Sequence, residues 1–422
     1  MDLPQTTTEP TSYVHDRETA DDSLAFLRDG YAYGTRRFER FGTDAFRTRL
    51  LGRPTVVVHG REAAAMFYDP RSMTRAGAIP TSVAHLLQDD GSVQTLEDAA
   101  HDHRKAAFLR LLGDAEAARM AEASGRAWAA AAAREAGRTR SLYDLGVEVL
   151  TRAALEWTGL PAGSADPRRL AGPLAEMVDA AARVGPRNWI ARLRRRRVER
   201  WAEAVLGMVR DGELEVPAGS PISVVAGLHD HDGSQPPLDI AAVELINLLR
   251  PIVAVARYVA FTGHALERHP HWRETLRGDA AARHRFVQEV RRFYPFFPVI
   301  AGTVRRGFTW REHEFEVGKR VVLDLYATNH DERIWTHPGR FDPDRFITWV
   351  YDPDALVPQG GGDAATGHRC PGEGATIALM ERFLEFATAD PAPYTVPPQD
   401  LRISLRRIPA LPQDRMLVTL AE

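Results

Sequence analysis

The sequence predicts a mainly α-helical protein with small β-sheets at one side. Apolar residues recur at helical spacing through most of the stretch from about 61 to 294 and again over about 372–389. Alternation typical of strands is confined to about 30–60, 299–325 and 402–419. Helices and strands do not alternate as βαβ units, which argues against a doubly wound sheet.

The elements can be assigned in order along the chain. We expect a hairpin over about 44–59 that turns at Gly52 to Pro54, because two short β-rich runs flank these turn-forming residues. Helices follow where the apolar period is 3.6. They are expected over roughly 61–69, 114–136, 141–158, 168–184, 188–211, 238–268, 281–294 and 372–389.

Composition places the chain among large enzymes and excludes several classes. The 422 residues carry a net charge of −3 and 44% aliphatic and aromatic residues, which suggests neither nucleic acid nor a disulfide framework. No repeat or long linker divides the chain, so a single domain over 1–422 is expected. The N-terminus lacks the pattern of a secretory signal, and no stretch approaches the ~18 apolar residues of a membrane span. We expect a cytoplasmic protein with no transmembrane segment.

The only cysteine, Cys370, lies in a glycine-rich loop ahead of an apolar helical pattern. The loop over 360–373 reads Gly-Gly-Gly-Asp-Ala-Ala-Thr-Gly-His-Arg-Cys-Pro-Gly-Glu. Glycines allow the backbone to approach a flat cofactor, Pro371 favours entry into the next helix, and N–H groups at the helix terminus can bond the sulfur. The pattern indicates an axial thiolate for haem iron. The alternative is a small buried hydrophobic residue in an ordinary loop.

A second pattern lies upstream, where Glu289 and Arg292 share one face of a predicted helix at i, i+3 spacing. Alone, this is an ordinary surface ion pair. Followed by a strand-rich stretch, the Cys370 loop and a last long helix, it resembles the cytochrome P450 superfamily. The resemblance implies the cytochrome P450 fold, haem b as cofactor, Cys370 as the axial ligand of its iron, and Glu289 and Arg292 as a structural clamp under the haem loop.

The long helix expected over 238–268 is interrupted by Arg250 and Pro251. Pro251 removes a helix donor and frees the carbonyl of Asn247, which predicts a kink. Arg250 keeps its charge and is costly to bury unpaired among aliphatic residues. From these residues alone, Arg250 either extends to solvent or pairs with a carboxylate elsewhere in the fold.

In typical oxygen-activating cytochromes P450 this helix presents an acidic residue followed by Thr. Here Arg250-Pro251 stands instead, which resembles the bacterial fatty-acid peroxygenase branch. That resemblance implies hydrogen peroxide as co-substrate, no obligatory redox partner, and a fatty acid or other carboxylic acid as substrate. Arg250 would hold the substrate carboxylate, which then serves as general acid–base. Hydroxylation at the α and/or β carbon is expected, with oxidative decarboxylation to terminal alkenes as a side reaction.

Further residues are carried over from this branch by their local motifs. The residues expected to bind the haem propionates are Arg75, His101, Lys105, Tyr326 and His368. Gln94 matches a distal position where hydroxylating members tend to carry Gln and alkene-forming members His, which favours hydroxylation. Val299 stands where a bulkier aromatic often lines the cavity, so a wider pocket is compatible with the sequence. His101-x-His103 lacks a second ligand pair for a metal site.

Two other functions are compatible with these residues. One is a monooxygenase that needs dioxygen and a redox partner and acts on another carboxylate substrate; the missing acid-alcohol pair argues against it. The other is a non-catalytic haem-thiolate or fatty-acid-binding protein that uses Arg250 only as an anchor. The basic run Arg192 to Arg200 is either a solvated helix face or a surface that attracts anionic lipid or steers carboxylate substrates.

Overall fold

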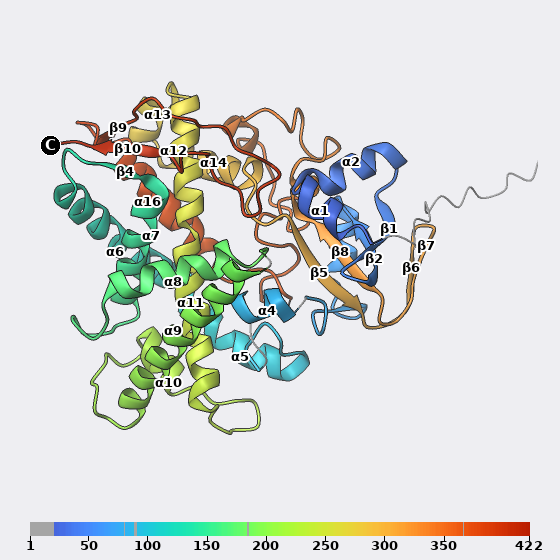
Figure 1. Cartoon of the computed structure of the whole chain (residues 1–422), viewed down its shortest axis with the longest axis horizontal. Coiled ribbons are helices and arrows are strands. Elements are labelled where there is room, and N and C mark those ends of the chain that lie inside the picture. Colours follow the sequence, from blue (N-terminus) through green and yellow to red (C-terminus); the bar gives the residue numbers. More distant parts are fainter. Residues whose placement is uncertain (1–20, 80, 88–90, 184, 366) are drawn as a thin grey trace, which may run out of the picture.

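Helices form most of the molecule, and a smaller sheet-rich part lies at one side of them, as the sequence predicts (Figure 1). The computed structural model describes residues 21–422 except 80, 88–90, 184 and 366. The helices are α1 Ser23–Asp29, α2 Ala32–Phe41, α3 Arg61–Phe67, α4 Thr81–Leu87, α5 Asp98–Leu111, α6 Asp114–Arg134, α7 Leu142–Trp157, α8 Pro167–Asp179, α9 Pro186–Arg210, α10 Pro221–Ala226, α11 Leu238–Ala254, α12 Ala256–Arg268, α13 Trp272–Gly278, α14 Ala280–Phe293, α15 Leu325–Asn329 and α16 Glu373–Ala387.

The strands form small sheets. They are β1 Ala45–Leu50, β2 Arg53–Val58, β3 Met73–Thr74, β4 Thr139–Ser141, β5 Val299–Val304, β6 Phe308–Trp310, β7 His313–Phe315, β8 Arg320–Asp324, β9 Tyr394–Thr395 and β10 Leu417–Leu420. The largest sheet has the order β1-β2-β8-β5-β3. Its β1–β2 hairpin confirms the expected one, but the turn is Leu51-Gly52, both with positive φ, and Pro54 already pairs with Arg49.

Two segments expected to be β-rich differ from the prediction. Within 30–60, α2 occupies Ala32–Phe41 and packs on β1, where the ring centroids of Phe38 and Phe46 lie 5.1 Å apart. Within 402–419, only β10 forms a strand, apart from an isolated bridge. β10 pairs with β4 and β9, and the Gln399 side chain also donates to the Leu417 carbonyl at 2.7 Å.

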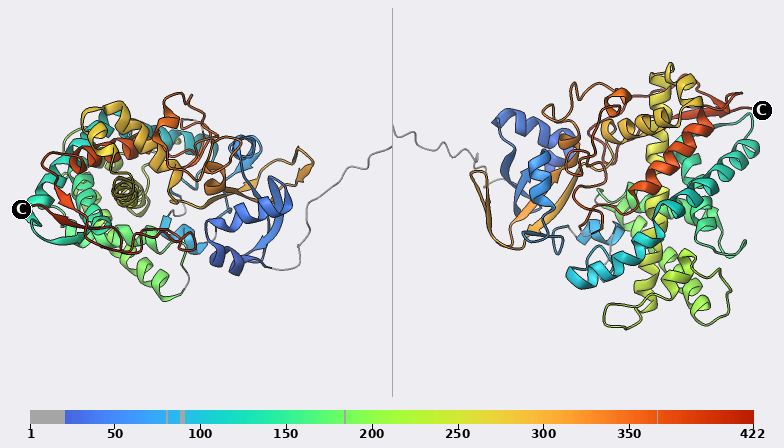
Figure 2. Two further views of the ribbon diagram at one scale, coloured as in Figure 1. Left: turned by 90° about the horizontal axis from the view of Figure 1, so that it is seen from above. Right: turned by 180° about the vertical axis from the view of Figure 1, so that it is seen from behind.

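A central column of two helices carries the Arg250-Pro251 pair. The expected helix over 238–268 is divided into α11 and α12 at Val255, whose N–H donates to the Ile252 carbonyl at 3.2 Å. The interruption therefore lies one turn beyond Pro251, and the two helices remain nearly collinear (Figure 1). Figure 2 shows this column end-on with other helices around it, so most of α11 is buried.

Two apolar cores hold this arrangement together. The larger one joins the column to α7, α16 and their neighbours, and includes the fully buried Trp128, which stacks on Phe386 with ring centroids 5.3 Å apart. The smaller one lies between the largest sheet and α3, around Phe67 and Val58. Among the described residues, no helix is both long and apolar enough to span a bilayer.

Candidate active site

Cys370 lies directly before α16, with its sulfur inside the molecule. The backbone N–H of Gly372 bonds the sulfur, as the sequence predicts for a helix terminus, and Gln359 Nε2 lies 3.8 Å from Sγ. Burial raises the pKa of the Cys370 thiol, and the Gly372 hydrogen bond acts in the opposite direction. An isolated thiol at this position is therefore neutral, and the thiolate form requires a cation such as a metal ion against it.

Glycines of the loop allow close packing on Tyr68. A Cβ on Gly360 would lie 2.7 Å from the Tyr68 hydroxyl, and one on Gly362 would lie 2.7 Å from Tyr68 Cβ. Both glycines also have positive φ, of 96° and 73°. From the sequence, we expected these glycines to let the backbone approach a cofactor. In the structure, the Tyr68 side chain already leaves no room for a Cβ at Gly360 or Gly362.

A buried ion network supports the loop, and the sequence analysis missed it. Arg369 Nε lies 2.6 Å from Glu373 Oε2, and Arg291 pairs with the same carboxylate. Arg291 also donates to Gln359 Oε1 at 3.2 Å, so the network reaches the side chain next to the sulfur. The i, i+4 spacing of Arg369 and Glu373 was the only sequence signal, because Arg291 is distant in the chain.

Glu289 and Arg292 form a fully buried bidentate pair. Arg292 Nε and Nη2 each lie 2.7 Å from a Glu289 oxygen, and both side chains have no exposed surface. Arg292 Nη1 also donates to the carbonyls of Asn329 and Pro338, each at 3.0 Å. The pair thus ties α14 to the segment that precedes the Cys370 loop, which is the arrangement expected of a clamp.

Four of the five residues expected at the propionates lie close together. The rings of His101 and His368 are 4.6 Å apart, and burial, followed by the charges of Arg75, His101 and Lys105, lowers the pKa of His368 to about 3. Lys105 is 3% exposed and donates to the Gly367 carbonyl, and burial lowers its pKa. A cluster of four basic side chains in one partly buried place favours an anionic ligand. The two carboxylates of a haem would match this cluster in charge.

Tyr326 has other neighbours. Its ring lies 5.5 Å from that of Tyr31 and 4.1 Å from that of His330, and its backbone N–H donates to the Pro298 carbonyl. His103, in turn, points away from His101, with Nε2 3.1 Å from the His229 carbonyl. Within the described ranges, no group of three or more His, Cys, Asp or Glu side chains could hold a metal ion.

Arg250 is buried, with 5% of its surface exposed, so it does not extend to solvent. Nη2 donates to Asn247 Oδ1 at 3.0 Å and to the Leu87 carbonyl, and Nη1 lies 3.4 Å from the Leu86 carbonyl. Asn247 Nδ2 in turn donates to Gln94 Oε1 at 2.9 Å. The structure therefore joins Arg250 and Gln94, two predicted site residues far apart in the chain, through one asparagine that the sequence analysis did not assign to the site.

A buried ion pair lies behind this asparagine. Glu244 has no exposed surface; its Oε2 accepts from Asn247 Nδ2 at 3.0 Å and its Oε1 lies 3.1 Å from Arg104 Nη1. Burial raises the pKa of the Glu244 carboxyl, while Asn247 and Arg104 oppose that shift. The only sign of this network in the sequence is an acidic residue inside an apolar helical run.

Pro251 is the exception in this part of α11. It is exposed, whereas Arg250, Ile252 and Val253 beside it are buried. Pro251 is therefore an exposed position within an otherwise buried stretch of a helix that lies inside the helical part (Figure 2). A partly buried cysteine, a basic cluster for two carboxylates and an exposed position on a central helix together fit a haem.

Comparison with known proteins agrees with this geometry. A family model described as Cytochrome P450 matches residues 284–389. The solved structure of cytochrome P450EX alpha (CYP152N1), wild-type with myristic acid, has a TM-score of 0.91 and 38% sequence identity, over 96% of this chain and 97% of that chain. This chain belongs to the cytochrome P450 family. Both the predicted fold and the predicted resemblance to the peroxygenase branch are confirmed.

Two further relatives show how the likeness is distributed. Cytochrome P450SP alpha (CYP152B1) in complex with (R)-ibuprophen has a TM-score of 0.89 and 37% identity, over 95% of this chain and 98% of that chain. The curated steroid 17-alpha-hydroxylase/17,20 lyase of Rana dybowskii is 34% identical over 104 residues, which are 23% of this chain and 19% of that protein. The chain thus matches about a fifth of the curated relative's length, in contrast to the near-complete structural matches.

Proposed function

We propose that this cytochrome P450 is a haem-thiolate peroxygenase that uses hydrogen peroxide to hydroxylate fatty acids at the α and/or β carbon. The observation that carries the proposal is the buried Arg250 guanidinium, fixed by Asn247 beside the open surface of Pro251. A guanidinium in this position matches a carboxylate in geometry and charge. The related P450EX alpha structure contains myristic acid, a ligand of the corresponding chemistry.

The proposal assigns the cofactor to residues that the structure brings together. Cys370 would ligate the haem iron, and Arg75, His101, Lys105 and His368 would hold the propionates. Tyr326 is the fifth proposed propionate ligand and would act through its hydroxyl, since its ring packs on Tyr31 and His330. When bound, haem supplies the oxidising chemistry.

Arg250 determines which carbon is oxidised. A carboxylate held by its guanidinium keeps the α and β carbons next to Pro251, while the rest of the alkyl chain extends away. The same carboxylate serves as general acid–base toward hydrogen peroxide, a role that no acid-alcohol pair fills at 250–251. Gln94, held by Asn247, favours hydroxylation, and decarboxylation to a terminal alkene is a minor product.

The proposal includes independence from a redox partner and a cytoplasmic location. A bulkier carboxylic acid is a second candidate substrate, since the related P450SP alpha structure contains (R)-ibuprophen. Val299, half-buried at the start of β5, is smaller than an aromatic residue and leaves room for such an acid.

Product analysis by mass spectrometry tests the proposal. The purified holoprotein is mixed with saturated fatty acids of several lengths and hydrogen peroxide, without reductase or NADPH. We expect 2-hydroxy and 3-hydroxy acids. Arg250→Ala should lower the rate of product formation by roughly 100-fold, because the carboxylate is no longer held and positioned.

Arg268→Ala is the matched control, since Arg268 is an exposed arginine at the end of α12 in the same column. It should oxidise fatty acids at the wild-type rate. Unchanged turnover by Arg250→Ala would contradict the role of Arg250. Oxidation that requires a reductase and dioxygen would instead support the monooxygenase alternative.

A further inference from the structure

The outer face of α9 exposes a group of large apolar side chains. Trp189, Ile190 and Leu193 are 64%, 47% and 59% exposed, and all three lie in the first two turns of the helix. Residues 189 and 193 are four apart and therefore share a face. Single exposed apolar residues are ordinary, but an indole and two aliphatic side chains together form a patch.

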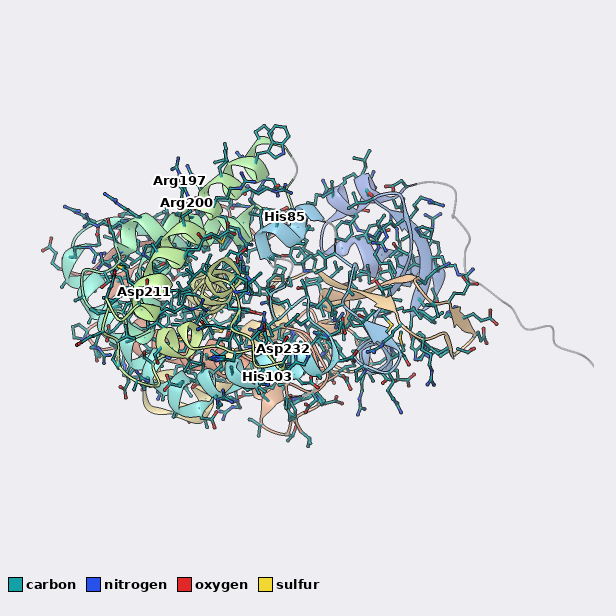
Figure 3. The ribbon with its side chains drawn as sticks, turned by 90° about the horizontal axis from the view of Figure 1, so that it is seen from below. His85, His103, Arg197, Arg200, Asp211 and Asp232 are labelled. Carbon is teal, nitrogen blue, oxygen red and sulfur yellow. The ribbon has the colours of Figure 1, made fainter. Side chains whose placement is uncertain are left out.

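Arginines continue this face toward the C-terminal end of the helix. Arg197 and Arg200 follow Leu193 at spacings of four and three, and Arg196 lies beside them; all three are exposed. Figure 3 shows Arg197 and Arg200 along the outer edge of α9. In the part of the chain that the structure describes, no carboxylate pairs with these three, and Arg200 Nε only lies 3.3 Å from the Arg196 carbonyl.

The neighbouring arginines of α9 are engaged differently. Arg194 pairs with Glu176 of α8, and Arg195 is buried and lies 2.6 Å from Glu199. The basic run noted in the sequence is thus divided into arginines bound within the protein and arginines that are left for solvent. The latter, with Trp189, Ile190 and Leu193, form what we call the α9 outer face.

Packing holds this face in a fixed position close to the site. On the opposite side of α9, Ala191 packs with Leu86 of α4 in a small apolar cluster. The carbonyls of Leu86 and Leu87 are the acceptors of the Arg250 guanidinium. One short helix therefore separates the α9 outer face from the residue proposed to hold the fatty-acid carboxylate.

We propose that the α9 outer face binds the surface of a membrane that contains anionic lipids. Apolar side chains, tryptophan among them, and adjacent arginines are the combination that inserts at the headgroup boundary and attracts anionic headgroups. A cavity of about 650 Å³ between α8 and α9, lined in part by Arg194, Arg197 and Trp201, provides room for a headgroup beside the face. A second copy of this chain is a poorer partner, because it would place the same positive charges opposite each other.

The proposal does not depend on the proposed oxidation, since membrane binding is measured without substrate. Full-length holoprotein is incubated with vesicles of phosphatidylcholine alone or with added phosphatidylglycerol, and the bound fraction is measured by sedimentation. We expect binding to the anionic vesicles that weakens as salt is raised. The triple variant Arg196→Gln/Arg197→Gln/Arg200→Gln should lower the partition coefficient roughly 100-fold.

Matched controls carry the same changes on other parts of the surface. The triple variant Arg40→Gln/Arg306→Gln/Arg340→Gln removes the same charge from exposed positions away from α9 and should bind like the wild type. Trp189→Ser/Leu193→Ser should weaken binding, whereas Leu24→Ser, at an 80% exposed leucine of α1, should not. Haem absorbance and circular dichroism check that each variant is folded.

Three outcomes would overturn the proposal. The first is equal binding to vesicles with and without phosphatidylglycerol, and the second is wild-type binding by the α9 triple variant. The third is a dimer in sedimentation velocity that Trp189→Ser/Leu193→Ser abolishes while vesicle binding is absent, since this would assign the face to a second copy of the chain.

Discussion

Asn247 connects Arg250 and Gln94, the two residues that we propose act on the substrate. Its amide accepts from Arg250 and donates to Gln94, so a single side chain fixes both. Glu244 holds the same amide nitrogen from behind and is itself bound by Arg104. The orientation of Arg250 therefore depends on the chain from Asn247 to Glu244 and Arg104, in the way that supporting hydrogen bonds position metal ligands.

Asn247→Ala should weaken catalysis without loss of haem. Arg250 and Gln94 lose their shared partner, and misplacement of the carboxylate is expected to lower kcat/KM for fatty acids by roughly 10- to 100-fold. Steady-state kinetics with hydrogen peroxide and spectral titration with a fatty acid would separate the effect on KM from that on kcat. An unchanged KM together with unchanged product positions would show that Asn247 does not position Arg250.

At the scale of single elements, α14 makes two separate sets of buried polar contacts near the Cys370 loop. Arg291 faces the network of Glu373 and Gln359, while Glu289 and Arg292 face the segment at Asn329 to Pro338. One turn of helix thus binds two loops that are distant in sequence. The i, i+3 spacing of Glu289 and Arg292 is visible in the sequence, but the segment that Arg292 binds is not.

Glu289→Gln should destabilise the protein by about 3–5 kcal/mol, because it leaves the buried Arg292 charge without its partner. The free energy of unfolding, measured with urea on the holoprotein, tests this. Glu385→Gln is the matched control: Glu385 pairs with Arg382 at the same i, i+3 spacing but is 40% exposed. Its loss should cost less than about 1 kcal/mol. Equal effects of the two substitutions would contradict the clamp.

At the scale of the whole molecule, His264 joins α12 to the C-terminal segment. Nε2 lies 3.1 Å from the Leu401 carbonyl, so this nitrogen carries the proton, and Nδ1 accepts from the Tyr294 hydroxyl at 2.8 Å. Burial lowers the pKa of His264 to about 4. The folded state therefore requires the neutral imidazole, while the unfolded chain takes up a proton below about pH 6.5.

This difference makes stability fall with acidification. The stabilisation that comes from the neutral His264 side chain is complete above the pKa of the unfolded chain. It is lost as the pH falls from about 6.5 toward 4. At pH 5 the loss from His264 is about 2 kcal/mol. The decrease in unfolding free energy between pH 7.5 and 5 should therefore be smaller by this amount in His264→Gln than in the wild type. Equal decreases would mean that His264 is not the group responsible.

Short patterns of neighbouring residues were enough to predict the family and its candidate site residues from sequence. Cys370 with its flanking glycines, Arg250 with Pro251, and Glu289 with Arg292 each occupy one loop or one turn of helix, where spacing and residue type identify the role. The long helices were also predictable, because their apolar residues repeat many times with a period of about 3.6 residues. Fold class and family were predictable for this reason.

Tertiary structure alone decided which of these residues meet. Gln94 and Asn247 are 153 positions apart, and Arg291 and Glu373 are 82 apart, so no periodicity records either contact. The same holds for Tyr326, whose ring packs on Tyr31 and His330, and for the segment near 402–419, where the only strand is β10, paired with β4 and β9. Hydrogen bonds and burial between distant segments are properties of the packed molecule, and only the packed molecule shows them.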